Sequence, residues 1–257
     1  MPRYFFTNTK RRFFVPLSFT STNTMITIQF VGTGGAFDFA QGNSAALISF
    51  KGKKILLDCG HSVYPRLREK GLAGAIDYIL LTHLHDDHVG SLSTLIFHQK
   101  YAEQKRAKLL YPTADFGDLL HQFLAFSQQK PEEYSDFLPL WQFPNGGISY
   151  IDTTGMHVPN MPTFAYIFED EDEILCYSGD MGNAYLFMTH FEKYPTTKKV
   201  RIFNEIIFYP NIKSHCYYKE LELLAAKYEV YGYHANHHEA PADNKIALVA
   251  NFEELIL

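Results

Sequence analysis

The sequence predicts an α/β protein in which two β-sheets lie together with helices on their outer faces. Strand-like runs come first, segments with helical spacing follow, and a second series of strand-like runs completes the chain. The 257 residues are 46% hydrophobic and 20% charged, which allows a sizeable core. We therefore expect one domain over residues 25–257, after an N-terminal extension.

The first half of this domain is predicted to supply a hairpin and an alternation of helices and strands. Residues 25–32 alternate in the manner of a strand and lead into a glycine-rich loop. Two further strands, 44–50 and 53–60, form a hairpin joined by Lys51–Gly52. The next segments are predicted as a helix (63–72), a buried strand (75–82), a helix (90–104), a strand (107–112) and a helix (116–129).

The second half begins with a segment whose composition predicts a loop or a lid. Residues 131–147 contain three prolines, a tryptophan and two glycines. Trp141, Phe137 or Phe143 could stack on a substrate base, and plain packing is the alternative. Later strands are predicted over 148–153, 163–170, 173–180, 200–208 and 228–234, with an amphipathic helix over 217–228.

Composition and the N-terminal residues indicate the expected location and partners of the protein. Residues 1–24 predict a disordered extension; a secretion signal is the alternative, but Pro16 interrupts its apolar piece and no A-x-A site follows. Three cysteines without a C-x-x-C pair favour a reducing, cytoplasmic location. No apolar run reaches membrane-spanning length, and a net charge of −5 without a basic tract makes broad contact with nucleic acid or membrane unexpected.

Residues 80–90, LLTHLHDDHVG, concentrate metal-binding side chains directly after a predicted strand. His83 and His85 are two positions apart, so extended backbone directs them to the same side. Asp87 and His88 follow where the chain turns into the next helix. Imidazole and carboxylate groups are ligands for zinc, manganese and iron. A histidine-rich surface loop is the alternative, but four such residues in this spacing favour a metal site.

The segment THLHDDH resembles the T-H-x-H-x-D-H signature of the metallo-β-lactamase fold. The resemblance extends from residue 25 to about residue 240 and includes the segments FVGTGGAF, GNSAALI, ILLDCG, GMHVPNMPTFAYIF, CYSGD and YGYH. It implies an αββα sandwich with the site at one edge. Asp at position 180 and His at position 85 differ from many zinc β-lactamases and from redox di-iron relatives, respectively, so the resemblance implies a hydrolase.

The resemblance also implies a set of ligands for two divalent metal ions. One ion would be bound by His83, His85 and His157, and the other by Asp87, His88 and His234, with Asp180 bridging the two. Zn²⁺ is the expected metal, with Mn²⁺ or Fe²⁺ as alternatives. Asp58 would orient a ligand histidine. His237 and His238 leave the choice of the last ligand open, because they follow His234 closely.

Within this fold the chain is similar to the ribonuclease Z-like branch, which cleaves phosphodiesters. Its transfer-RNA enzymes carry a long arm, but residues 158–179 here hold two strands and the acidic turn EDEDE. They also carry a His-Glu-Ala-Thr motif, whereas Asn204 precedes Glu205 here, and asparagine cannot deliver a proton. We therefore expect a small substrate such as a cyclic nucleotide, with nucleic acid a less favoured partner.

Asp87 and Asp180 are the expected catalytic groups, together with His237 or His238 in place of the missing acid. His61, His98, His121, His190 and His215 are expected to be ordinary core or surface residues. The branch implies a homodimer in which a loop of one subunit completes the site of the other. A ribonuclease and a catalytically silent binding module are the alternatives to a small-molecule phosphodiesterase.

Overall fold

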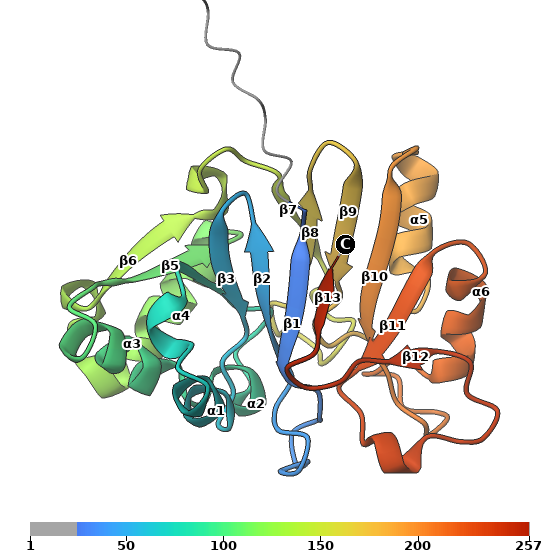
Figure 1. Cartoon of the computed structure of the whole chain (residues 1–257), viewed down its shortest axis with the longest axis horizontal. Helices are drawn as coiled ribbons and strands as arrows, with labels where there is room; N and C mark the ends of the chain where they lie inside the picture. The colour runs from blue at the N-terminus through green and yellow to red at the C-terminus, as the bar shows by residue number, and fades with distance from the viewer. Residues whose placement is uncertain (1–24, 257) are drawn as a thin grey trace, which may run out of the picture.

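The computed structural model describes residues 25–256 as two β-sheets packed face to face, with helices on the outside (Figure 1). The sheets are ordered β13-β1-β2-β3-β4-β5-β6 and β12-β11-β10-β9-β8-β7. The first contains β1 (Thr27–Gly32), β2 (Ala45–Phe50), β3 (Lys53–Leu57), β4 (Tyr78–Leu80), β5 (Ala107–Tyr111), β6 (Ser135–Pro139) and β13 (Glu254–Ile256). The second contains β7 (Ile148–Asp152), β8 (Phe164–Glu169), β9 (Glu173–Tyr177), β10 (Lys199–Glu205), β11 (Glu229–Tyr233) and β12 (Ala247–Leu248).

Helices cover the outer face of each sheet, so the predicted αββα sandwich is confirmed. The α-helices are α1 (Val63–Glu69), α2 (Asp86–Val89), α3 (Leu92–Tyr101), α4 (Ala114–Gln128), α5 (Leu186–Lys193) and α6 (Glu222–Ala225). The predicted extension, residues 1–24, lies outside the described residues. Within residues 25–256, no helix is both long and apolar enough to cross a membrane.

The predicted hairpin forms as expected. Strands β2 and β3 pair antiparallel around Lys51 and Gly52, which both have positive φ, at 49° and 72°. Such a two-residue turn matches the twist of the strands that it joins. Strand β1 pairs with β2 on one side and with the short β13 on the other. Strand β13 has only three residues and was not predicted.

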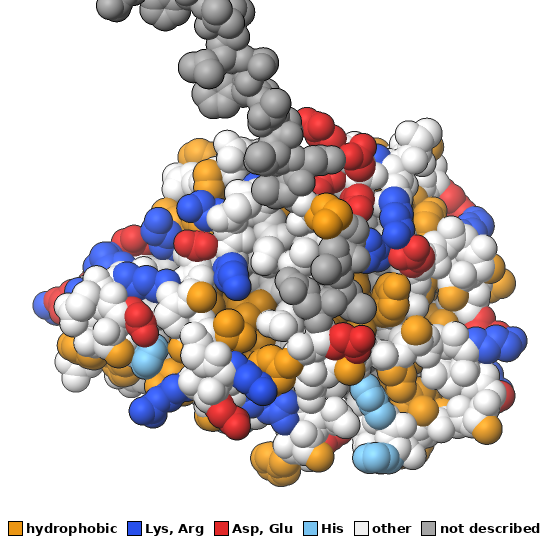
Figure 2. Space-filling model, in the orientation of Figure 1, with side chains coloured by type: hydrophobic (Ala, Val, Ile, Leu, Met, Phe, Trp, Pro, Cys, Tyr) orange, Lys and Arg blue, Asp and Glu red, His pale blue; other side chains and the backbone are white. Residues whose placement is uncertain are grey.

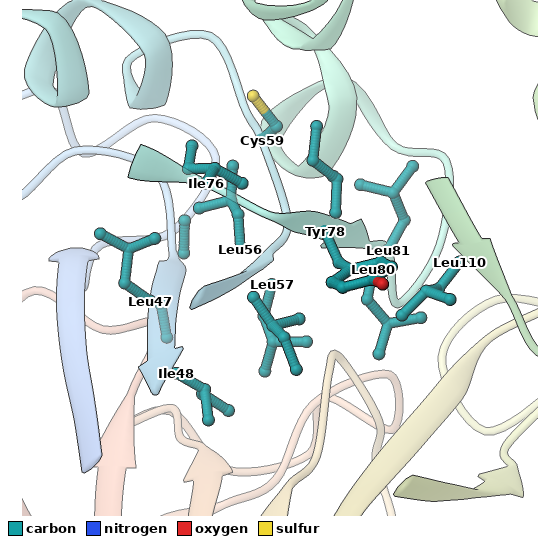
Figure 3. Close-up of a cluster of buried hydrophobic side chains, with 14 of the residues drawn as sticks. Leu47, Ile48, Leu56, Leu57, Cys59, Ile76, Tyr78, Leu80, Leu81 and Leu110 are labelled. Atoms are coloured by element: carbon teal, nitrogen blue, oxygen red, sulfur yellow. The ribbon is translucent and has the colours of Figure 1, made fainter. Parts of the chain in front are cut away.

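Apolar and aromatic side chains of both sheets fill the space between them. Phe30 of β1 lies with its ring centroid 5.7 Å from that of Phe203 and 5.4 Å from that of Tyr233, both in the second sheet. Figure 3 shows aliphatic side chains of this core, including Ile48 and Leu57. Each such side chain, when fully buried, stabilises the fold by about 1.5–3 kcal/mol.

The outer face of the second sheet carries its own apolar layer. Phe187 and Phe191 of α5 are buried against it, although the sequence analysis did not predict this helix. The amphipathic helix predicted over 217–228 is shorter than expected. It consists of a 3₁₀ turn, Tyr218–Leu221, followed by the four residues of α6.

The prediction of a loop or lid over residues 131–147 is wrong in its centre. Residues 135–139 form β6, which pairs parallel with β5 at the edge of the first sheet. Phe143 is 3% exposed, and its ring packs against Phe50 and Tyr78 with centroids 5.9 and 5.3 Å away. Phe143 is thus a core residue that cannot stack on a base, while Trp141 is 80% exposed.

Parallel pairing brings the candidate site residues to one edge of the sandwich. Strands β3, β4 and β5 run parallel in the first sheet, as do β9, β10 and β11 in the second. Their carboxyl ends therefore open at a common edge, at the bottom of Figure 1, where ligand sites of such sheets collect.

Candidate metal centre

The histidine turn begins just after β4 and is fixed by close contact with the end of β3. A Cβ atom at Gly60 would lie 1.9 Å from the carbonyl oxygen of Asp87, so only glycine fits there. The backbone N–H of Cys59 donates to the carbonyl of His88 at 2.7 Å. Asp87 and His88 lie in the short helix α2, at the place of the predicted turn.

Three imidazoles form the first group of converging donors. The Nδ1 atom of His85 lies 3.1 Å from Nε2 of His83 and 3.1 Å from Nε2 of His157. Tetrahedral zinc with Zn–N bonds of 2.0–2.1 Å requires nitrogens about 3.3 Å apart. Burial lowers the pKa of His83 and of His85, which favours the neutral imidazoles that metal ions bind. These three residues therefore fit one divalent cation.

A second group of donors meets the first at Asp180. It comprises Asp87, His88, Asp180 and His234, with ligand atoms within 4.8 Å of one another. The carboxylate oxygens of Asp180 lie 3.4 Å from His88 Nε2, 3.4 Å from His234 Nε2 and 3.9 Å from His157 Nε2. Asp180 thus touches members of both groups, as a bridging carboxylate must.

Several of these polar atoms are buried without a hydrogen-bond partner among the described residues. They include Nε2 of His88 and Oδ1 of Asp180. A buried polar atom without a partner costs about 1–3 kcal/mol, and a bound cation would supply one. Burial raises the pKa of Asp180, but His234 and His88 outweigh it and hold the pKa well below its usual value. The site therefore favours an ionised carboxylate among nitrogen donors, which is the chemistry of a metal centre.

Hydrogen bonds behind the donors fix their orientation. The ring of His88 donates from Nδ1 to Oδ2 of Asp58 at 2.9 Å, which matches the expectation for Asp58. The other carboxylate oxygen, Oδ1, accepts from the backbone N–H of Thr82 at 2.8 Å. His157 donates from Nδ1 to the carbonyl of Ser214 at 2.9 Å. Each contact leaves the opposite ring nitrogen facing the centre.

Backbone strain is also concentrated at the centre. Asp58 and His234 have φ of 62° and 66°, in the left-handed region that costs non-glycine residues about 1–3 kcal/mol. The strand-end position of His234 is held by the N–H of Ala235, which donates to the carbonyl of Thr33 at 3.1 Å. The conformation directs a buried ring, 8% exposed, into the cluster.

His215 is the site residue that sequence reasoning missed. Its ring centroid lies 4.9 Å from that of His157 and 5.5 Å from that of His234. Its Nδ1 lies 3.1 Å from Oε2 of Glu205, the buried last residue of β10. The chain leaves β10 and returns, so that the N–H of Ile207 donates to the carbonyl of Cys216 at 2.8 Å. No local sequence motif predicts that the chain comes back beside β10, and only the tertiary fold brings His215 to the centre.

The Glu205–His215 contact is an ion pair at neutral and mildly alkaline pH, because burial raises the pKa of Glu205 to about 7. Burial lowers the pKa of His215, but the hydrogen bond and charge of Glu205 outweigh it and raise the pKa to about 9. The second carboxylate oxygen of Glu205 accepts from the N–H of Cys216 at 2.8 Å and of Met181 at 3.2 Å. Glu205 is therefore fixed and holds the His215 ring by Nδ1.

The structure does not bring His237 and His238 into either donor group. They lie in a 3₁₀ turn, His237–Glu239, where His237 is half-buried and His238 is exposed. Their catalytic role stays a prediction, and His215 is the histidine beside the cluster. Asn204 is buried, and its amide donates to the carbonyl of Glu205 at 2.8 Å.

Comparison with known proteins supports the fold and identifies similar proteins. The crystal structure of the metallo-β-lactamase fold protein YhfI from Bacillus subtilis superimposes with a TM-score of 0.70 at 18% identity, covering 90% of this chain and 99% of that chain. Human tRNase Z, short form, gives 0.65 at 16% identity, covering 89% and 98%. Anti-Pycsar protein Apyc1 of Paenibacillus harenae is 31% identical over 166 residues, which are 60% of this chain and 67% of that protein.

The structure has the metallo-β-lactamase fold, as predicted, with two donor groups that could hold metal ions. Residues 26–253 match the family described as Anti-Pycsar protein Apyc1, and the chain belongs to that family. The matched stretches span 65% to 67% of the length of the first relatives.

Proposed function

We propose that this protein hydrolyses the phosphodiester bond of a small cyclic nucleotide. The observation that carries the proposal is the convergence of seven donors in two groups at Asp180. The family supports it, because Anti-Pycsar Apyc1 proteins are cyclic-nucleotide-degrading phosphodiesterases. The absence of an arm between His157 and Asp180, where β8 and β9 follow a short loop, favours a small substrate over RNA.

Two divalent cations are the proposed cofactors, with zinc as the expected identity. His83, His85 and His157 would hold one, and Asp87, His88 and His234 the other, with Asp180 shared. When bound, such ions lower the pKa of water from about 15.7 toward 7 and stabilise charge on phosphoryl oxygens. Nitrogen-rich donor sets suit zinc, while manganese and iron remain alternatives.

Residues of the chain orient the metal-binding histidines and the proposed proton donor. Asp58 and the carbonyl of Ser214 hold the rings of His88 and His157 by Nδ1, so that Nε2 of each faces the centre. Because Glu205 accepts from Nδ1 of His215, Nε2–H of that ring is left to donate to the leaving oxygen of the substrate. His215 would thereby supply the proton donor that Asn204 cannot provide.

We further propose that residues 25–257 act as one hydrolase domain and that the enzyme works in the cytoplasm as a homodimer. The shared core between the two sheets supports a single domain. Three buried, unpaired cysteines are compatible with a reducing compartment. The homodimer rests on the resemblance to the branch alone.

The test is hydrolysis by purified protein reloaded with zinc or manganese. Substrates are a panel of 3′,5′-cyclic nucleotides, a transfer-RNA precursor and bis(p-nitrophenyl) phosphate. We expect cleavage of at least one cyclic nucleotide and of the aryl diester. Cleavage of the RNA without any cyclic nucleotide would favour the ribonuclease alternative, and metal binding without turnover on any substrate would favour a binding module.

A further inference from the structure

A pocket of about 340 Å³ opens beside the metal centre. Its walls come from the turn 35–38, from residues 206–209 after β10, and from residues 234–239 after β11. His215 and His234 line it and also belong to the centre, so that the two spaces are continuous. Its volume lies in the range of pockets that hold small ligands.

Phe37 places an aromatic ring at the pocket while remaining 90% exposed. Its turn is fixed by backbone hydrogen bonds, from Asp38 N–H to the Gly35 carbonyl at 3.2 Å and from Gly42 N–H to the Asp38 carbonyl at 2.9 Å. Figure 2 shows hydrophobic side chains at the lower edge of the molecule, over the loop between β1 and β2. The turn therefore places Phe37 at the pocket, and its exposed ring does not contribute to the core.

Phe39 provides a natural comparison within the same loop. It is 86% exposed, and it does not line the pocket. Loss of either ring removes a similar exposed surface, so the two positions differ mainly in their relation to the pocket.

Glu239 contributes a hydrogen-bond acceptor to the wall of the pocket. The carboxylate of Glu239 accepts from the hydroxyl of Tyr209 at 2.7 Å and from the side-chain amide of Asn236 at 3.2 Å. The Asn236 carbonyl oxygen in turn accepts from the N–H of His238 at 3.1 Å. Asn236 keeps one amide N–H, and the oriented carboxylate of Glu239 has lone pairs left to accept from a ligand.

Given the proposed function, on which this inference rests, we propose that the pocket is the base subsite: Phe37 stacks on the nucleobase, and Glu239 accepts a hydrogen bond from an amino group on its edge. Every base offers a π-face, and base–aromatic stacking changes binding by roughly 5- to 100-fold. Carboxylates pair with the amino group of cytosine, whereas the carbonyl at the same position of uracil is another acceptor. The Glu239 carboxylate therefore favours amino-bearing bases.

The experiment compares Phe37→Ala, Phe39→Ala and Glu239→Gln with the unaltered, metal-reconstituted enzyme. Substrates are cyclic CMP, cyclic UMP and a 3′,5′-cyclic ribose phosphate with methoxy in place of the base. Steady-state kcat and KM are measured, and binding of cytidine 5′-monophosphate is followed by calorimetry.

We expect Phe37→Ala to lower kcat/KM for cyclic CMP by roughly 5- to 100-fold, chiefly through KM, and to weaken binding of the monophosphate in parallel. The base-free compound should be unaffected, and Phe39→Ala should stay within about twofold of the unaltered enzyme for all three substrates. Glu239→Gln should lower the ratio of kcat/KM for cyclic CMP to that for cyclic UMP by about tenfold.

Equal effects of Phe37→Ala and Phe39→Ala, or an equal loss on the base-free compound, would overturn the base subsite while leaving the proposed function intact. An unchanged ratio in Glu239→Gln would overturn the amino-group contact. If the unaltered enzyme cleaves bis(p-nitrophenyl) phosphate but no cyclic nucleotide, or cleaves nothing, the proposed function fails and the subsite fails with it.

Discussion

Replacing His215 by alanine should slow hydrolysis of a cyclic nucleotide by roughly 10²–10⁴-fold, the usual contribution of a general acid. The structure supports this range because the ring is already oriented: Nδ1 lies 3.1 Å from Oε2 of Glu205, and the ring touches both His157 and His234. An alkoxide leaving group needs a proton, whereas p-nitrophenolate does not. Cleavage of bis(p-nitrophenyl) phosphate should therefore change little.

The assay measures kcat/KM for both substrates at the same metal loading, with His237→Ala and His238→Ala as matched controls. If His215 is the acid, these two variants should leave both rates within about threefold of the unaltered enzyme, because neither ring belongs to a donor group. Metal content is measured alongside, since His157, Asp180 and His215 also have close ligand atoms. Equal loss on both substrates together with loss of metal would refute the donor role and make His215 a ligand.

Three further outcomes follow from the structure. Asp180→Ala should lower turnover by at least about 10³-fold, because its carboxylate touches both donor groups. The circular dichroism spectrum should stay native. Residual activity within tenfold of the unaltered enzyme would show that Asp180 is misassigned. Phe143→Ala should lower the free energy of urea unfolding by about 3–5 kcal/mol without changing KM. Trp141→Ala should change neither quantity. A raised KM in Phe143→Ala with unaltered stability would support the prediction of a lid. In metal-free protein, burial raises the pKa of Glu205 to about 7, and Glu205 raises the pKa of His215 to about 9, so the ion pair exists between these values. Because the folded-state pKa of His215 is raised, the stability that its charged form contributes is lost as pH rises through about 9. The urea midpoint should fall over that window and fall less in Glu205→Gln, and identical slopes would contradict the ion pair.

Local patterns determined much of the fold and the centre of the site. The hairpin at Lys51–Gly52 and the buried strand before His83 follow from alternation and turn chemistry, which depend on neighbouring residues. The spacing of His83, His85, Asp87 and His88 is equally local. The family resemblance then pointed to His157, Asp180 and His234, which the structure brings to the same edge.

Features that depend on distant contacts could not be predicted from the sequence. His215 comes to the centre only because the chain returns beside β10, and Phe143 enters the core only because β6 pairs with β5. Proline and glycine made the segment resemble a loop, although β6 lies between Pro131 and Pro144 and ends at Pro139. His237 and His238 are close to His234 in sequence, but the positive φ of His234 turns the chain there.

Titration of metal into chelator-treated protein tests the central claim most directly. Zinc is added stepwise, and the initial rate of cyclic-nucleotide hydrolysis is measured against the metal content per chain. Two donor groups that share Asp180 predict a rate that reaches its maximum at about two ions per chain. A maximum at or below one ion per chain, or no hydrolysis with two ions bound, would contradict the account.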